Sequence, residues 1–572
     1  MKNLVRLKES RAVRLAASAV AVAAIIAGAI GIVAGQGNAA PPTKADNAPS
    51  KSARFGHAKL RHGLLKIKGT RASDAIALRL KPGDPGTLQV DFGDDGSADF
   101  SFVGGKIARI AVDARAGDDR VRIDDSNGAF TDAIPTTIAG GDGNDSLAGG
   151  KGSELLLGGD GNDSIDGNGG NDLALLGADD DTFVWDPGDG SDTVEGQDGH
   201  DTMLFNGAAV AEQVDLSANG NRLTFFRNPG NVTMDTHGVE RVDFPALGGV
   251  DLVTVNDLSG TDVKDVNLDL AGTPGGAGGD GQADRVVVNG TNGNDAIDVS
   301  GDSTEVKVSG LAPRVAIFHP EPTDELDVHA LGGNDTIDAS ALAADAILFE
   351  PDGGSGDDTI AGGKGIDKLL GGPGNDSIDG NGGNDLALLG AGDDTFVWDP
   401  GDGSDTVEGQ NDVDTMVFNG ANAAEQPIAL SANGRRVELF RNPGPITMDT
   451  NDVERIDINA LGGADRLIVD DLSGTAVNDV NVDLAGTLGG ATGDGQADRV
   501  VVNGTDGDDA INVNGDAGGV KVSGLVPTVE IFHPEVANDR LELNTSAGTD
   551  AVDFSGLAAG AIQLFVDGVR VR

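Results

Sequence analysis

The residues of this chain with the clearest chemistry are acids that recur every nine positions among glycines. Residues 140–148 read GGDGNDSLA, and the frame G-G-x-G-x-D-x-U-x, with U a large apolar residue, continues through four further units. A second block of five units begins at Gly353. The sixth position holds an acid in every unit: Asp145, Glu154, Asp163, Asp172, Asp181, Asp358, Asp367, Asp376, Asp385 and Asp394.

Such acids suit a hard cation. Calcium takes six to eight oxygen ligands, and Asp carboxylates together with turn carbonyls from stacked turns could complete that shell. Without an ion, the stacked carboxylates would repel one another. The pattern therefore predicts Ca²⁺ as the cofactor and folding that requires it. An ion at about 100 times its dissociation constant would add roughly 2.7 kcal/mol per independent site.

The eighth position of every unit is apolar, which indicates the element that must hold the acids in place. A six-residue glycine-rich turn followed by a three-residue strand, with one apolar side chain pointing inward, is typical of a half-turn in a narrow parallel solenoid. Glycine is expected in the turn because the turn needs positive φ angles and closely approaching carbonyls. The apolar residues are Leu147, Leu156, Ile165, Ala174, Phe183, Ile360, Leu369, Ile378, Ala387 and Phe396.

Over residues 140–204 and 353–417 the two blocks resemble the calcium-binding nonapeptide repeats of RTX, or hemolysin-type, proteins. The resemblance implies a parallel β-roll in which successive units alternate between two sides and each calcium lies between units n and n+2. It pairs Asp145 with Asp163, Asp163 with Asp181, Asp358 with Asp376, Asp376 with Asp394, and Asp367 with Asp385. The predicted metal residues are Gly140, Asp142, Asp145, Asp160, Asp163, Asp172, Asp181, Asp192, Asp358, Asp367, Asp376, Asp385, Asp394 and Asp405.

Several units depart from the repeat. Glu154 replaces the sixth Asp beside Lys151 and Ser153, and the first glycine is lost at Leu176 and at 389. After the fifth unit both blocks read TFVWDPGDGSDTVEG, in which Trp185 and its counterpart at 398 interrupt the frame. This insertion is either a ligand site or, as we favour, a corner where the indole covers the open end of a narrow core.

The remainder of the chain is a duplication of short strands. The motif IFHPE occurs at 317–321 and 531–535, and apolar and polar residues alternate between Gly/Asp turns, which predicts strands. Acids also recur about every forty residues, at Asp74, Asp119, Asp251, Asp295, Asp335, Asp465, Asp509 and Asp550. These segments are either wider solenoid turns or sandwich-like strands.

We therefore predict an all-β fold in which parallel β-roll blocks, that is, calcium-binding solenoids, alternate with β-rich solenoid-like or sandwich-like modules. The expected order is a signal peptide at 1–39, a disordered spacer at 40–55, an N-terminal β-rich module at 56–135, β-roll block 1 at 140–204, a β-rich module at 205–350, β-roll block 2 at 353–417 and a C-terminal β-rich module at 418–572.

The N-terminus indicates export. Five basic residues precede or open an apolar run from Leu15 to Gly35, which is typical of a secretory signal peptide. The run is also near membrane-spanning length, so an uncleaved anchor is the alternative. Residues 41–52 are rich in Pro, Ala, Asn and Lys, as in a disordered spacer.

The charge limits the classes of partner that the chain can bind, and the cysteine content limits how it can be stabilised. The net charge of −53 attracts cations and repels nucleic acid and anionic membrane surfaces. The chain has no cysteine, so no disulfide can staple an exported protein of this size, and metal is the expected substitute. Millimolar extracellular calcium matches the affinities of extracellular modules, about 10⁻⁴ to 10⁻³ M.

The sequence contains no H-E-x-x-H, G-x-S-x-G or P-loop motif. The best catalytic candidates are His319 with Glu321 and His533 with Glu535, for which we favour a strand-capping turn. Residues 91–99 resemble half of an EF-hand loop, but Phe102 stands where a bidentate Glu is expected, so a polar hairpin turn is favoured.

The predicted function is calcium binding by an exported repeat protein that folds on calcium, with a structural or adhesive role at the cell surface or in the extracellular matrix. We expect no enzyme activity. The alternative is a secreted calcium-dependent hydrolase with an unrecognised active site near His319 or His533.

Overall fold

The computed structural model describes residues 56–572. The predictions of a signal peptide, a membrane anchor and a spacer fall on residues 1–55 and lie outside the described residues. Residues 56–572 are built from strands, with two short 3₁₀ turns, η2 (Gly104–Lys106) and η3 (Asp125–Asn127). This part of the chain contains no helix that is both long and apolar enough to cross a membrane.

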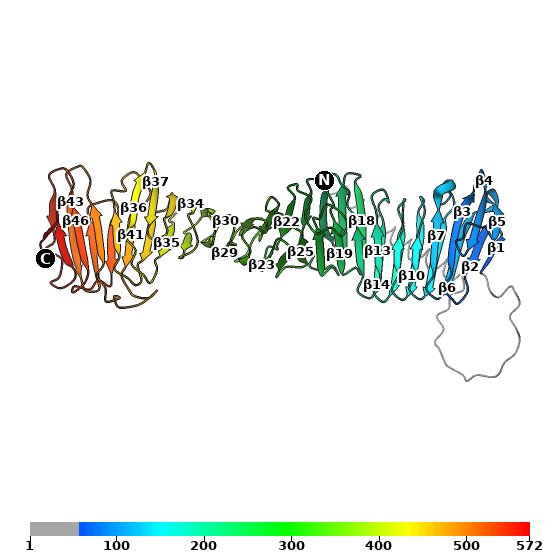
Figure 1. The fold of residues 1–572 in the computed structure, drawn as a ribbon, viewed down its shortest axis with the longest axis horizontal. Coiled ribbons are helices and arrows are strands. Elements are labelled where there is room, and N and C mark those ends of the chain that lie inside the picture. The colour runs from blue at the N-terminus through cyan, green and yellow to red at the C-terminus, as the bar shows by residue number, and fades with distance from the viewer. Residues whose placement is uncertain (1–55) are drawn as a thin grey trace, which may run out of the picture. The chain divides into compact units, whose positions relative to one another are not determined.

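Most strands of the first sheet pair in parallel, so the chain returns to the same sheet once per turn. Figure 1 shows this succession of turns. In the order of pairing the strands are β1 (His57–Arg61), β2 (Leu64–Lys68), β6 (Arg109–Ala116), β8 (Thr136–Asp142), β10 (Glu154–Asp160), β12 (Leu173–Ala178), β14 (Thr193–Asp198), β18 (Val232–His237), β17 (Arg222–Asn228), β16 (Gln213–Asn219), β20 (Leu252–Val255), β22 (Arg285–Asn289), β26 (Glu325–His329), β28 (Leu348–Asp352), β30 (Lys368–Pro373), β32 (Leu386–Ala391), β34 (Thr406–Asn411), β38 (Ile446–Asn451), β37 (Arg436–Arg441), β36 (Ile428–Asn433), β40 (Arg466–Val469), β42 (Arg499–Asn503), β46 (Arg540–Asn544), β48 (Gln563–Val566) and β49 (Val569–Arg570).

The second sheet collects the alternate strands. Its pairings run β5 (Phe100–Val103), β4 (Asp84–Phe92), β3 (Ala75–Lys81), β7 (Arg120–Asp124), β9 (Ser146–Ala148), β11 (Ser164–Asp166), β13 (Thr182–Trp185), β15 (Thr202–Phe205), β19 (Arg241–Pro245), β21 (Asp265–Asp269), β25 (Arg314–Phe318), β24 (Glu305–Ser309), β23 (Ala296–Asp302), β27 (Thr336–Leu342), β29 (Thr359–Ala361), β31 (Ser377–Asp379), β33 (Thr395–Trp398), β35 (Thr415–Asn419), β39 (Arg455–Asn459), β41 (Asp479–Asp483), β45 (Thr528–Phe532), β44 (Gly519–Ser523), β43 (Ala510–Asp516) and β47 (Ala551–Asp553). Successive nonapeptide units thus alternate between the two sheets, as the resemblance implied.

The core lies between the sheets and follows the period of two. In β10 and β12 every second residue is buried, and the apolar eighth position of each nonapeptide unit is at most 1% exposed. One inward side chain per three-residue strand is a thin core. It therefore supplies little hydrophobic stabilisation per turn, about 1.5–3 kcal/mol for each fully buried large aliphatic or Phe side chain.

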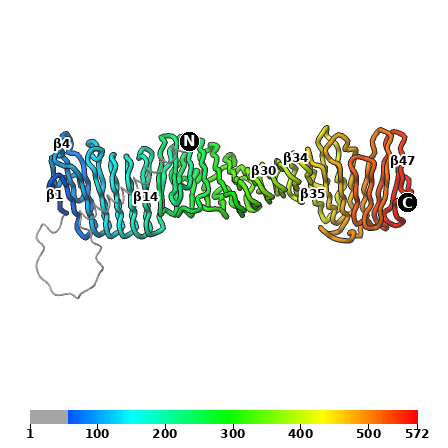
Figure 2. Tube along the Cα trace, turned by 180° about the vertical axis from the view of Figure 1, so that it is seen from behind, coloured from blue at the N-terminus to red at the C-terminus, as the bar shows by residue number. Residues whose placement is uncertain are grey.

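Outside the blocks the solenoid continues, which decides between the two alternatives for these segments. Parallel pairing runs from β14 to β18 and from β16 to β20, and the antiparallel strand β17 fills the space between β18 and β16. In the second sheet the antiparallel strand β24 lies in the same way between β25 and β23, which pair in parallel with β21 and β27. Figure 2 shows the turns following one another to β47. The wide segments are solenoid turns and not separate sandwiches, and the module boundaries stay a prediction.

Candidate metal centre

Two acidic ladders run along the strand starts of the β-roll. Each sixth-position acid lies at the start of a strand or immediately before it, and its backbone N–H donates to a carboxylate one full turn later. The N–H of Asp145 donates to Oδ1 of Asp163 at 2.7 Å, and that of Asp163 donates to Oδ1 of Asp181 at 2.7 Å. On the first-sheet side, Glu154 donates to Asp172 at 2.7 Å, so the Glu keeps the ladder intact.

The second block repeats the arrangement. Asp358 donates to Asp376 at 2.8 Å, Asp376 to Asp394 at 2.7 Å, and Asp367 to Asp385 at 2.9 Å. All five pairs that the resemblance implied are therefore in direct contact. The predicted metal residues Asp192 and Asp405 continue the ladders. The backbone N–H of Asp172 donates to Asp192 at 2.8 Å, and that of Asp385 donates to Asp405 at 2.9 Å.

One oxygen of most ladder acids has no partner. The ladder acids within the blocks are at most 4% exposed, and among residues 56–572 no hydrogen-bond donor reaches the second oxygen of any of them except Asp367. A buried carboxylate oxygen without a partner is costly, so this set fits a hard cation as the missing ligand partner. The atoms are Oδ2 of Asp145, Asp163, Asp172, Asp181, Asp192, Asp358, Asp376, Asp385, Asp394 and Asp405, and Oε1 of Glu154. Asp367 differs, because its Oδ2 accepts the N–H of Gly363 at 2.6 Å.

In most units that keep it, the first glycine makes room for that oxygen. A Cβ on Gly158 would lie 2.3 Å from Oδ2 of Asp163 and 2.1 Å from the carbonyl oxygen of Leu176. On Gly140 it would lie 2.0 Å from Oδ2 of Asp145. A carboxylate and a carbonyl oxygen thus approach the same bare Cα, and both are ligand types that calcium accepts.

The second glycine has a different reason. Gly159 has φ +134°, and a Cβ there would lie 1.9 Å from the carbonyl oxygen of Gly141 in the preceding turn. Positive φ and close carbonyl approach, the two predicted reasons for glycine, therefore apply at this position. At the first position a carboxylate oxygen comes close as well as a carbonyl oxygen.

Burial dominates the electrostatics of the ladders. It raises the pKa of Asp163 to about 7 and that of Asp172 to about 9, although a backbone N–H bond opposes the change. Burial likewise raises the pKa of Asp385 to about 8. Neighbouring ladder carboxylates add repulsion in each case. A divalent ion would reverse this effect by favouring the charged form.

Two predicted metal residues lie elsewhere. Asp142 and Asp160 are exposed and are Cα partners at the ends of β8 and β10, away from the buried acids. Among the predicted metal residues, the structure brings the sixth-position acids together with Gly140 and leaves these third-position carboxylates in solvent. Their role as ligands stays a prediction.

The ladders also extend beyond the nonapeptide units. Asp74 donates to Asp119 and Asp119 to Asp145, at 2.6 and 2.8 Å. In the first sheet Glu212 donates to Asp251 and Asp251 to Asp284, at 2.7 and 2.8 Å. The second copy repeats this ladder at Glu425, Asp465, Asp498 and Asp539. The forty-residue recurrence of acids marked Asp74, Asp119, Asp251 and Asp465 without assigning them to a metal. It missed Glu212, Asp284, Glu425, Asp498 and Asp539.

The tryptophan insertion is a packed corner. Trp185 is fully buried, stacks on Phe205 at a centroid distance of 3.9 Å, and donates from Nε1 to the carbonyl of Gly190 at 2.9 Å. Arg227 lies over the ring at 5.2 Å. Trp398 repeats these contacts. The side chain belongs to the core, as the corner interpretation requires.

The histidine motifs end strands. His319 follows β25 with φ 55°, and its Nδ1 lies 2.8 Å from Oδ1 of Asp269, while Glu321 accepts the N–H of Gly281. His533 repeats the contact with Asp483 at 2.7 Å. The segment 91–99 is a hairpin turn between β4 and β5 in which Asp91 binds Arg79 at 2.8 Å. Each of these groups already has protein partners.

The comparison with protein families agrees with the ladders. The RTX calcium-binding nonapeptide repeat matches four segments, residues 136–159, 149–183, 188–207 and 352–387. A crystal structure of extracellular lipase LipA from Serratia marcescens is 17% identical with a TM-score of 0.14, and the match covers 60% of this chain and 42% of the lipase chain. A search of curated proteins finds no match. The chain thus carries four copies of the RTX calcium-binding nonapeptide repeat, in these four segments.

Proposed function

We propose that the chain is an exported protein that folds on binding calcium and that the whole length of both ladders, beyond the nonapeptide units, takes part in binding. The observation that carries the proposal is the row of buried carboxylate oxygens without a protein partner. These oxygens recur outside the matched segments, at Asp119, Asp251, Asp335 and Asp465. The same geometry before each strand supports the same ligand.

Ion binding would supply stability that the thin core lacks. The three-residue strands of the rolls, such as β9 and β11, bury one large side chain each. The ladders beside them hold carboxylate oxygens that have no partner. A chain of this kind gains stability in proportion to the logarithm of calcium concentration at each site. It would remain unfolded where calcium is scarce and would fold after export into millimolar calcium.

Calcium titration of the chain lacking residues 1–39 tests the proposal. Circular dichroism follows the β structure, and the fluorescence of Trp185 and Trp398 follows the two corners, with magnesium as the control ion. We expect a cooperative gain of β signal and burial of both indoles with calcium. A chain already folded in chelator, with no response to calcium, would contradict the proposal.

We further propose a structural or adhesive role at the cell surface or in the matrix. Support comes from the repetitive solenoid, the net charge of −53 and the absence of cysteine. Such a charge disfavours nucleic acid and anionic membranes as partners. Binding of the calcium-loaded protein to whole cells and to isolated matrix, with and without chelator, measures this role.

The proposal assigns no catalysis to the chain. His319 and His533 contact Asp269 and Asp483 in the two copies, which suits a repeated strand-ending turn. A hydrolase remains the second candidate, and the paired variant His319→Ala with His533→Ala separates the two. Loss of a hydrolytic activity in the paired variant, with calcium-dependent folding intact, would favour the hydrolase.

A further inference from the structure

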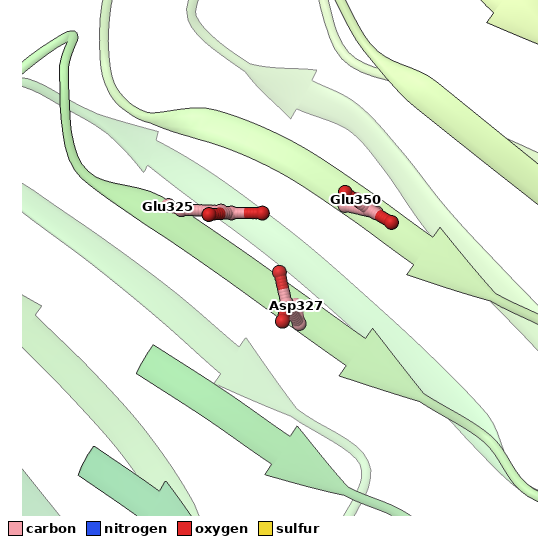
Figure 3. Close-up of side chains that lie close together, drawn as sticks. All are labelled: Glu325, Asp327 and Glu350. Atoms are coloured by element: carbon pink, nitrogen blue, oxygen red, sulfur yellow. The ribbon is translucent and has the colours of Figure 1, made fainter. Parts of the chain in front are cut away.

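Three acids outside the ladders converge on the outer face of the first sheet. Glu325 and Asp327 lie on β26, and Glu350 lies on the adjacent strand β28 as the Cα partner of Asp327. One carboxylate oxygen from each lies within 4.8 Å of the others. Figure 3 shows the three side chains lying close together across the two strands. They form a compact set of oxygen ligands.

Asp327 is unusual for its position. Its neighbours Leu326 and Val328 fill the core, so Asp327 projects from the opposite face, yet it is 0% exposed. Its Oδ2 accepts from Nε of Arg285 at 2.6 Å, while its Oδ1 has no hydrogen-bond partner among residues 56–572. A fully buried carboxylate oxygen without a donor points to a missing cation.

The protein's own cations do not complete the set. Lys368 contacts Oε1 of Glu350 at 2.5 Å, and Nε of Arg285 is 3.9 Å from Glu325. Three carboxylates thus face two positive side chains, one of which already binds Asp327. Glu325, Glu350 and Lys368 line an open groove with Leu348, so water can reach these two carboxylates and fill further coordination positions.

The duplicated copy provides an internal comparison. The positions equivalent to Glu325, Asp327 and Glu350 are Arg540, Glu542 and Phe565, because β46 and β48 pair in the same register as β26 and β28. There Arg540 donates to Glu542 at 2.9 Å, and Arg499 binds the other oxygen. The second copy neutralises its half-buried acid with two guanidinium groups, whereas the first copy places a third acid at the position of Arg540.

We propose that Glu325, Asp327 and Glu350 bind a hard divalent cation, calcium or magnesium, in place of the guanidinium of Arg540. Carboxylate and water oxygens are the ligands that both ions take. The ion joins β26 to β28 at the point where one buried apolar cluster ends, at Phe349, and the next begins, at Ile360. Both strands belong to the first of these clusters, so the ion would hold the end of that cluster together. Its binding does not depend on occupancy of the ladders.

Terbium luminescence in the Leu348→Trp background tests the site. Leu348 is 47% exposed and is the Cα partner of Glu325, so an indole there can sensitise Tb³⁺ held by the cluster. We expect an emission component that both Glu325→Arg and Asp327→Asn remove. Glu325→Arg copies the second copy's arrangement, so it should keep calcium-dependent folding by circular dichroism. Glu542→Gln is the matched control and should retain the component.

Competition with Tb³⁺ identifies the ion. Displacement by calcium alone indicates a calcium site, and displacement by magnesium as well indicates a site that takes either ion. Asp367→Asn, which alters the nearby ladder, should leave the component in place. Equal emission with and without Glu325→Arg would overturn the site. So would a component that Asp367→Asn alone removes, or the absence of any component. A chain that never responds to calcium refutes the proposed folding but not this site.

Discussion

Each ladder aspartate uses its two oxygens for different purposes. In Asp163, Oδ1 accepts the N–H of Asp145 and aligns successive turns, whereas Oδ2 is buried without a partner. Asparagine in place of Asp163 would keep an acceptor for the first contact and remove the charge from the second. The substitution therefore separates the hydrogen bond from ion binding.

We expect Asp163→Asn to have opposite effects with and without calcium. With calcium, the titration midpoint should rise about tenfold, corresponding to about 1.4 kcal/mol, because a charged ligand is lost. In chelator, the variant should be more stable than the parent, because a buried charge with a raised pKa has gone. Urea unfolding in calcium and the residual β signal by circular dichroism in chelator measure the two effects.

Asp160→Asn is the control for that substitution, since Asp160 is exposed. It should change neither the calcium midpoint nor the stability in chelator by a comparable amount. If Asp160→Asn weakens calcium binding as much as Asp163→Asn does, the third-position acids are ligands, as the sequence predicted, and their placement in solvent is wrong.

At the scale of the turn, glycines differ in importance according to what faces them. A Cβ on Gly167 would lie 2.4 Å from Oδ2 of Asp172, whereas on Gly169 its nearest contact would be 3.6 Å away. We expect Gly167→Ala to destabilise the calcium-bound protein by about 1–3 kcal/mol, through overpacking against the carboxylate. Gly169→Ala should stay within about 0.5 kcal/mol. Thermal unfolding in calcium compares the two, and equal effects would mean that the first glycine serves only the turn.

A separate prediction concerns the part of the ladder that lies outside the nonapeptide units. Oδ1 of Asp465 accepts the N–H of Glu425 at 2.7 Å, its Oδ2 lacks a partner, and burial raises its pKa to about 7. We expect Asp465→Asn to reduce the calcium-induced hydrogen-exchange protection of β40 and β42. The exposed Asp479 provides the control, Asp479→Asn. If protection is unchanged or increases in calcium, binding is confined to the nonapeptide units.

Much of the fold and of the acidic ladders could be predicted from the sequence, because in the repeat the same nine residues determine both the turn and its ligands. An acid at every ninth residue and an inward apolar residue two positions later determine the turn, the strand and the alternation of sheets. The wider turns were harder, because antiparallel strands such as β17 look the same in sequence in a solenoid and in a sandwich. The cluster at Glu325 has no periodic signal at all, since it forms only when β28 pairs with β26.

For the molecule as a whole, the ladders predict an unusual response to pH. Burial holds the pKa of Asp145, Asp163 and Asp172 at about 6, 7 and 9, against about 3.9 for an unfolded Asp. A raised folded pKa means that the folded state binds protons more tightly. Its contribution to stability is complete below about pH 4 and is lost as pH rises through the folded values.

Without metal, the protein should therefore be more stable at pH 5 than at pH 8. With saturating calcium the order should reverse, because protons and calcium compete for the same oxygens and the ion binds the charged form. Urea midpoints in calcium and the residual β signal by circular dichroism in demetallated buffer, each at pH 5, 6, 7 and 8, give the two curves. If the ladder acids are already fully ionised at pH 5 without metal, the metal-free curve will not change between pH 5 and pH 8. Parallel curves would show that calcium binds away from the buried acids, so the crossing of the two curves is the result that links the ladders to the ion.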